Sequence, residues 1–212
     1  VEYLDTILGG MDGEVSKQFQ RILAKQGIEF NLGAKVTGVE KTGEGAKVTF
    51  EPVKGGEAQT LDADVVLVAT GRKPFTDGLG LADLGVEMTD RGQVKTDDHW
   101  ATSVKGVYAI GDAITGPMLA HKAEHEGVIC IEKIAGVPGV HPMDKAKIPG
   151  CTYCNPQVAS VGLTEAKAKE QGREIRVGRY NFNANGKAIA LGEDQGLIKT
   201  IFDKKTGELI GA

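Results

Sequence analysis

The sequence predicts an α/β fold that is followed by a separate, smaller α+β unit. Thirty of the 212 residues are glycine, about twice the usual share, as expected of a chain with many tight turns. Residues 64–71 read DVVLVATG, an apolar run that does not alternate with polar residues. Such a run is typical of a strand buried on both faces of a mostly parallel sheet. From residue 148 the pattern changes to short strands around one helix.

The first part of the chain predicts a helix and a β-meander. Residues 15–26 carry apolar side chains near helical spacing, and Gly27 follows as a usual helix end. Strands are then expected at residues 28–32, 35–41, 46–52 and 60–62. Glycine-containing turns at residues 43–45 and 54–56 separate them. These short, closely spaced strands predict an antiparallel arrangement.

The middle of the chain predicts two buried strands and one helix. After the strand at residues 64–71, Pro74 stops any helix, and residues 75–102 read as loops. A second buried strand is expected at residues 107–112, which ends in Gly-Asp. A helix is expected at residues 119–135, where Gly136 and Pro138 follow.

The last part predicts the α+β unit. Strands are expected at residues 158–161, 175–182 and 197–202, with one helix at residues 164–171. Thr164 and Glu165 form a typical helix start, because a threonine side chain can accept a hydrogen bond from the first turn.

Composition argues against several classes of protein. The formal net charge is −4, so no basic field favours nucleic acid or an anionic membrane. The sequence has no apolar run of membrane-spanning length and no signal peptide. Three cysteines, an odd number, argue against a disulfide-stapled secreted domain and favour a reducing compartment. Both chain ends are expected to be cut from a longer protein.

Three residues are candidates for nucleotide contacts. Glu2 lies in a strand-like start, where an acidic residue can bind ribose hydroxyls, although an exposed glutamate with no role is the favoured interpretation of this residue by itself. Gly71 ends an apolar strand and would let a nucleotide approach the backbone. Asp112 stands at a strand–helix turn, where it either accepts bonds from a sugar-like chain or merely caps the turn.

Two short motifs suggest metal or redox chemistry. Residues 121–125 read HKAEH, which matches a zinc-peptidase pattern, but a third ligand would be needed. Cys151 and Cys154 form a C-x-x-C that could be a redox pair or half a zinc site. No second C-x-x-C exists, so two structural thiols are the favoured interpretation, and no metal is predicted.

Several segments together resemble a known family. They are similar to the flavoprotein disulfide oxidoreductases with two dinucleotide-binding domains, and within these to the dihydrolipoamide dehydrogenase family. The segments that carry the resemblance are GEVSK at residues 13–17, VLVATGRKP at 66–74, YAIGD at 108–112 and GPMLAHKAE at 116–124. The MLAH run is the most specific of these.

The resemblance implies the domain organisation. Residues 1–73 would form the C-terminal part of a Rossmann-like NAD-binding domain. Residues 74–143 would form the second segment of an FAD-binding domain. Residues 144–212 would begin an α+β dimerisation domain.

The resemblance also implies cofactor contacts. Glu2 would bind the adenosine ribose of NAD, with Val36 and Gly71 lining the NAD site. Asp112 would bind the ribityl chain of FAD. A flavin-lining run would follow at the start of the helix, formed by Met118, Leu119, Ala120 and His121, and this role for His121 replaces the zinc interpretation.

The implied function belongs to a longer protein. It would oxidise dihydrolipoyl groups through an enzyme disulfide and FAD to reduce NAD, as a homodimer that serves the lipoyl-bearing acyltransferases of 2-oxoacid dehydrogenase complexes. Bacterial cytoplasm and mitochondrial matrix both fit. The family's C-x-x-x-x-C disulfide, its catalytic His–Glu pair and its glycine fingerprints are absent from the sequence, so no catalytic residue is predicted. The alternatives are a glutathione- or mercuric-type reductase and a non-catalytic nucleotide-binding or dimerising remnant.

Overall fold

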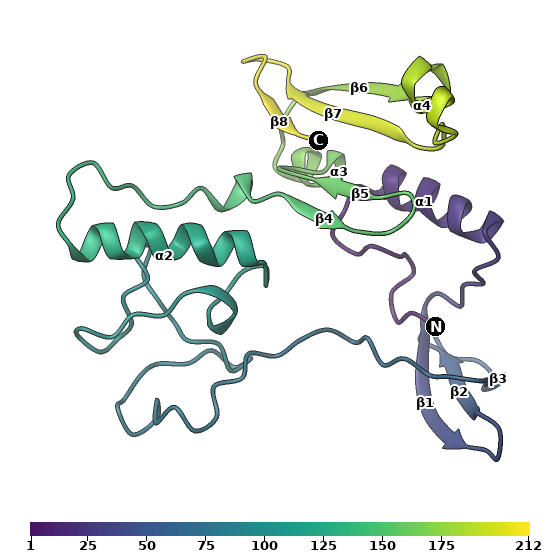
Figure 1. The fold of residues 1–212 in the computed structure, drawn as a ribbon, viewed down its shortest axis with the longest axis horizontal. Helices are drawn as coiled ribbons and strands as arrows, with labels where there is room; N and C mark the ends of the chain where they lie inside the picture. The colour runs from purple at the N-terminus through teal and green to yellow at the C-terminus, as the bar shows by residue number, and fades with distance from the viewer. The chain divides into compact units, whose positions relative to one another are not determined.

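The computed structural model describes residues 1–212, which form two compact units. Unit 1 joins the two ends of the chain, Val1–Val68 and Pro149–Ala212, and unit 2 is Ala69–Ile148. The mixture of helices and sheets expected from the sequence is confirmed (Figure 1). No helix has the length and apolar character that crossing a bilayer requires.

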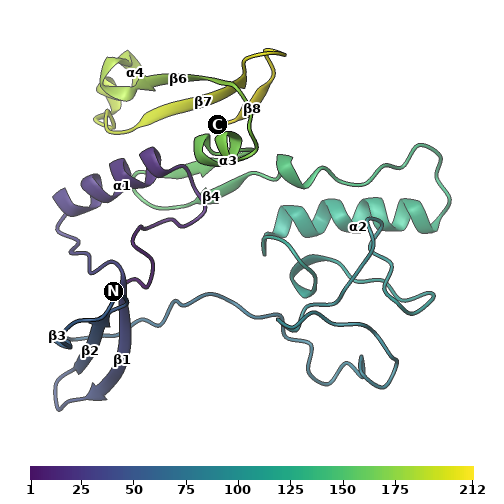
Figure 2. The same ribbon diagram turned by 180° about the vertical axis from the view of Figure 1, so that it is seen from behind.

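Unit 1 begins with the predicted helix, α1, at Gly13–Lys25. Asp12 caps it, because its side chain accepts a hydrogen bond from the Glu14 N–H at 3.0 Å. One face of the helix is buried, formed by Ser16, Phe19 and Ile22. The two opposite views both place α1 beside α3 of the same unit (Figures 1 and 2).

The predicted meander is confirmed. It comprises β1 at Ala34–Lys41, β2 at Ala46–Pro52 and β3 at Gln59–Ala63, all antiparallel in the order β1-β2-β3. Alternate residues Val48 and Phe50 of β2 are buried, as expected of a sheet with one covered face. The strand expected at residues 28–32 is wrong. Only a single parallel bridge forms there, between Leu32 and Glu2, so no continuous ladder holds the segment as a strand.

The strands and the helix predicted for the α+β part are also confirmed, but its prediction as a separate unit is wrong, because residues 149–212 form one compact unit with residues 1–68. The strands of the α+β part are β4 at Gly150–Thr152, β5 at Val158–Ser160, β6 at Ile175–Asn181, β7 at Leu197–Asp203 and β8 at Leu209–Gly211. They form two antiparallel sheets, β4-β5 and β6-β7-β8. The helices are α3 at Glu165–Glu170, the 3-10 turn η3 at Phe182–Ala184 and α4 at Gly186–Leu191. Thr164 caps α3 as predicted, whereas α4 was not predicted.

Unit 2 packs irregular loops against one helix, α2, at Ala120–Ile134. Two 3-10 turns accompany it, η1 at Gly111–Ala113 and η2 at Lys145–Lys147. The buried core consists of Val86, Val94, Trp100, Ile114 and Cys130. Residues 75–102 contain no helix or ladder, as predicted.

The two strands that the sequence predicted as buried on both faces are wrong. Residues 65–70 pair with no strand, and the Val65 side chain is 84% exposed. In the second segment only Tyr108 makes a bridge, to Ala101, and it is 41% exposed. An apolar strand becomes buried when neighbouring strands and covering layers are present. Neither segment belongs to one of the sheets that residues 1–212 form, so no paired strands bury it on both faces.

Candidate functional site

The Gly-Asp turn of unit 2 is held by the helix that follows it. Gly111 adopts a left-handed backbone with φ +68°, which favours glycine. Its N–H donates to Oε2 of Glu126 at 2.7 Å, and its carbonyl accepts from Nζ of Lys122 at 3.1 Å. Both side chains come from α2, one turn apart. The N–H and the carbonyl of Gly111 are therefore both held by side chains of α2.

The two side chains that hold the turn form a buried ion pair. Nζ of Lys122 lies 3.1 Å from Oε1 and 3.2 Å from Oε2 of Glu126. The Lys122 and Glu126 side chains are 1% and 0% exposed. Buried charges require a partner and additional hydrogen bonds, because water no longer solvates them. The Gly111 peptide groups supply those bonds, so the ion pair and the turn depend on each other.

Asp112, the next residue, lines a depression of about 520 Å³. The other lining residues are Arg72, Lys73, Pro74, Phe75, Ala113 and Met118. The Asp112 carboxylate can accept hydrogen bonds from hydroxyl groups, and the positive charges of Arg72 and Lys73 can bind phosphate oxygens. Met118 and Phe75 add apolar surface. This donor set fits a ligand that carries hydroxyls, phosphates and an apolar part. The Asp112 and Met118 of the sequence prediction thus lie together.

The remaining predicted residues of unit 2 lie at the start of α2. Leu119 is the extended residue before the helix, and Ala120 and His121 form its first turn. Unpaired N–H groups at a helix start favour negative charge nearby. His121 and His125 are exposed on α2, and no group of three or more His, Cys, Asp or Glu residues is placed to hold a metal.

The residues predicted to contact NAD fall in both units. Glu2 is exposed in unit 1, and its Oε1 accepts a hydrogen bond from the Leu4 N–H at 2.9 Å. Val36 lies in β1 opposite Phe50 and is half exposed. Gly71, with φ +104°, belongs to unit 2.

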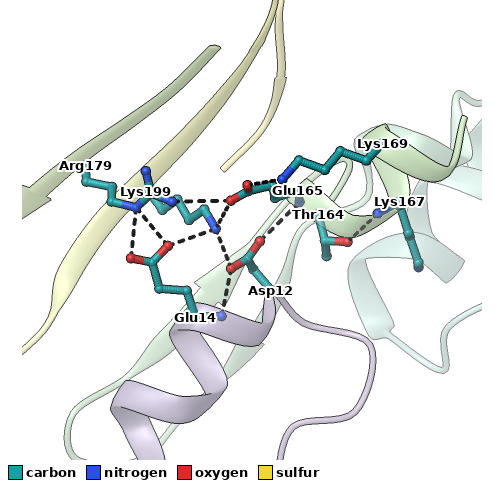
Figure 3. Close-up of polar contacts among 8 residues, drawn as sticks. All are labelled: Asp12, Glu14, Thr164, Glu165, Lys167, Lys169, Arg179 and Lys199. Carbon is teal, nitrogen blue, oxygen red and sulfur yellow. Dashed lines mark hydrogen bonds and ion pairs between the residues drawn. The ribbon is translucent and has the colours of Figure 1, made fainter. Parts of the chain in front are cut away.

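Sequence reasoning missed a cluster of charges in unit 1 (Figure 3). The buried Lys199 on β7 places Nζ 2.8 Å from Oδ1 of Asp12, 3.0 Å from Oε2 of Glu14 and 2.7 Å from Oε2 of Glu165. Arg179 on β6 also binds Glu14, with Nε 2.8 Å from Oε2. The carboxylates come from the starts of α1 and α3, so the cluster fastens residues near position 12 to the last third of the chain. No local sequence motif indicates that Lys199 and Asp12, which lie 187 positions apart, contact each other.

These contacts shift the pKa values of the cluster. The ammonium of Lys169, followed by that of Lys199, lowers the pKa of Glu165 from 4.5 to about 2. Lys199 and then Arg179 lower the pKa of Glu14. Burial alone would lower the pKa of Lys199, but its three carboxylate partners outweigh burial and raise it. All members are therefore charged near neutral pH.

All three cysteines are free thiols. Cys130 is buried in the core of unit 2, and its burial, then the nearby Asp97, raises the pKa of its thiol. Cys154 is exposed, and its Sγ donates to the carbonyls of Thr152 and Pro156 at 3.4 Å and 3.1 Å. The surroundings of Cys130 therefore disfavour its thiolate form, which is the reactive one.

Comparisons with known proteins bear on these observations. The chain is 58% identical over 212 residues to dihydrolipoyl dehydrogenase of Rhizobium etli, which covers all of the chain and 44% of that relative. It is 51% identical over 211 residues to mitochondrial dihydrolipoyl dehydrogenase of Pisum sativum, covering all of the chain and 42% of the relative. The chain thus spans less than half the length of these relatives.

A solved structure shares the fold. The HOCl-induced flavoprotein disulfide reductase RclA from Escherichia coli superposes with a TM-score of 0.87 at 25% identity, over 99% of this chain and 47% of that one. Residues 148–212 match the profile of the pyridine nucleotide-disulphide oxidoreductase dimerisation domain. Residues 1–127, more than half of the chain, match the profile described as pyridine nucleotide-disulphide oxidoreductase. The resemblance found in the sequence is therefore confirmed, and the chain belongs to the pyridine nucleotide-disulphide oxidoreductase family.

Proposed function

We propose that the full-length protein is a dihydrolipoyl dehydrogenase, which oxidises dihydrolipoyl groups and reduces NAD through FAD. The observation that carries this proposal is the 58% identity to the Rhizobium etli enzyme over all 212 residues. The donor set around Asp112 supports it, because the depression there offers hydroxyl acceptors and phosphate partners.

The FAD contacts are assigned to unit 2. FAD, when bound, supplies the two-electron carrier between dithiol and nicotinamide. Asp112 accepts hydrogen bonds from the ribityl hydroxyls, and Arg72 and Lys73 offer positive charge to the phosphates. Met118, with Leu119, Ala120 and His121 at the start of α2, provides the surface along the flavin.

The NAD contacts are assigned to Glu2, Val36 and Gly71. The exposed carboxylate of Glu2 can accept hydrogen bonds from ribose hydroxyls. Gly71 has no Cβ and is not crowded, so a nucleotide can approach its backbone. The domain division that goes with these roles is 1–73 for NAD, 74–143 for FAD and 144–212 for dimerisation.

The proposal includes partners and a compartment. The dimerisation profile over residues 148–212 supports a homodimer. Lipoyl-bearing acyltransferase subunits of 2-oxoacid dehydrogenase complexes are the expected substrate carriers. Bacterial cytoplasm or mitochondrial matrix is the expected location, since the relatives above include a bacterial and a mitochondrial enzyme.

The thiol chemistry is not assigned to residues 1–212. Thiol–disulfide exchange needs a thiolate and a base to move its proton. Cys130 is buried, and the Cys151–Cys154 spacing differs from the family's C-x-x-x-x-C. We expect the redox disulfide and the catalytic base in the part of the relatives' length that these residues do not cover.

The experiment is a substrate comparison with the purified full-length protein. NADH formation is followed with dihydrolipoamide and NAD, and in parallel NADH or NADPH oxidation is followed with glutathione disulfide and with mercuric ion. Dihydrolipoamide-dependent NADH formation, in a protein with a flavin absorption spectrum, is the expected result. Turnover with glutathione disulfide or mercuric ion alone would favour a related reductase, and a flavin-free protein with no turnover would favour a non-catalytic remnant.

A further inference from the structure

We propose that Lys122 and Glu126 are positioning residues for the flavin site, which set the place of Asp112 by holding Gly111. The inference rests on the proposed function, in which Asp112 binds FAD. Neither side chain lines the depression beside Asp112, so both would act through the backbone of the turn.

The two contacts fix both peptide groups of Gly111. The N–H that Glu126 accepts at 2.7 Å belongs to the peptide before Gly111. The carbonyl that Lys122 binds at 3.1 Å belongs to the peptide that leads directly into Asp112. Because a peptide group is planar, holding that carbonyl also fixes the path of the chain to the Asp112 Cα.

Close packing against α2 restricts the conformation of the turn at Gly111. A Cβ built on Gly111 would lie 3.2 Å from Cβ of Ala123 on α2, so the turn sits directly against the helix. Asp112 itself is exposed, and its carboxylate has no hydrogen-bond partner within the chain. The turn therefore presents a free carboxylate from a clamped backbone, which is the arrangement that pre-organised ligand binding needs.

Burial of the Lys122–Glu126 ion pair costs desolvation free energy, which apolar side chains in the same space would not cost. Apolar side chains of similar volume often match or exceed the stability that a buried ion pair provides. Glu126 Oε1 even lacks a hydrogen bond, although it lies in ion-pair contact with Lys122. Apolar replacements, however, could not hold the N–H and the carbonyl of Gly111. This distinction between filling space and holding the turn gives the inference its test.

The test titrates FAD into the apo form of the full-length protein and compares variants. Lys122→Met removes the donor to the Gly111 carbonyl, and Glu126→Gln removes the charge that Lys122 needs. We expect each to raise the FAD Kd by about tenfold or more. The matched control is Lys133→Met, which changes an exposed lysine of the same helix that has no ion pair, and it should leave the Kd within about twofold.

A double variant separates positioning from stability. Lys122→Met with Glu126→Gln leaves no unpaired buried charge, so the melting temperature of the apo protein should recover relative to the single variants. Positioning predicts that the FAD Kd stays raised, because the Gly111 carbonyl still lacks its donor. Recovery of the Kd together with the melting temperature would overturn the inference.

The outcomes also separate the two proposals. Tight FAD binding by the wild-type protein with unchanged Kd values in both single variants overturns the positioning role and leaves the proposed function standing. If the wild-type protein binds no FAD, the proposed function fails, and the positioning role fails with it.

Discussion

Each unit of this protein contains one buried lysine, and the two lysines are used differently. Lys199 in unit 1 meets three carboxylates from α1 and α3, which lie far from it in the sequence. Lys122 in unit 2 meets one carboxylate, four residues along the same helix, and a backbone carbonyl. The first lysine joins elements into a fold, whereas the second fixes a single turn.

The difference shows how a buried charge can serve stability or geometry. Around Lys199, each carboxylate has other partners as well, including the Arg179 guanidinium and the Lys169 ammonium, so the cluster is a network. Around Lys122 the only groups held besides its partner are those of Gly111, beside the candidate flavin contact. We therefore expect changes at Lys199 to affect stability and changes at Lys122 to affect the ligand as well.

The largest expected effect is that of Lys199→Met. Removal of the buried ammonium leaves the Asp12 carboxylate without a cationic partner and takes one of the cations from Glu14 and Glu165, which should lower the free energy of unfolding by about 4 kcal/mol. Urea unfolding of the full-length protein, with hydrogen exchange of β7 peptides, measures the loss. The exposed Lys205→Met, in the turn after β7, is the control. Equal effects of the two substitutions would refute the role of the network.

Acid should weaken unit 1 through the same carboxylates. The pKa of Glu165 is about 2 in the folded protein and 4.5 as its ordinary value, so its stabilisation is complete above 4.5 and is lost as pH falls towards 2. We expect a loss of about 2 kcal/mol across this window, discounted because the Glu165 side chain is 22% exposed.

Urea midpoints measured from neutral to acid pH test this window. The matched variant Glu165→Gln should have a shallower pH dependence than the wild-type protein, since it cannot titrate at that position. A midpoint that falls equally steeply in both proteins would mean that Glu165 does not contribute.

A smaller effect distinguishes the clamped turn of unit 2 from an ordinary turn. Gly111→Ala suffers both the positive φ and the close contact with Ala123, for a cost of about 2 kcal/mol. Gly106→Ala has a positive φ but open space around its Cβ, for a cost of about 1 kcal/mol. Thermal unfolding of both variants gives the difference, and identical costs would show that the contact with α2 is unimportant.

The smallest effect is expected for Arg179→Gln. The Arg179 side chain is 45% exposed, and exposed ion pairs contribute little because water screens them and ordering the side chains costs entropy. The free energy of unfolding should change only marginally. A loss as large as that of Lys199→Met would mean that exposure does not separate the members of the network.

Local patterns predicted the elements that are complete within the chain. The amphipathic residues of α1 and the threonine cap of α3 act over a few residues, and both helices are confirmed. The α+β part at residues 148–212 was recognisable for the same reason. The family, too, was visible in contiguous motifs such as YAIGD and GPMLAH.

The failures came where structure depends on distant partners. The run at residues 64–71 has the composition of a buried strand, but no described strand pairs with it. Likewise, nothing local to Lys199 indicates that Asp12 will bind it, and nothing near Gly111 indicates that a lysine and a glutamate on α2 will hold it. Candidate contacts such as Asp112 could be proposed from the sequence, whereas the side chains that position them required the structure.

The most direct test of the account compares the two buried lysines in one measurement. FAD is titrated by fluorescence into the apo forms of the full-length wild-type protein, Lys122→Met and Lys199→Met, at a temperature where all three are folded. We predict a Kd raised about tenfold or more for Lys122→Met and a Kd near the wild-type value for Lys199→Met. Equal Kd values for the two variants would contradict it, because the buried lysines would then have the same role.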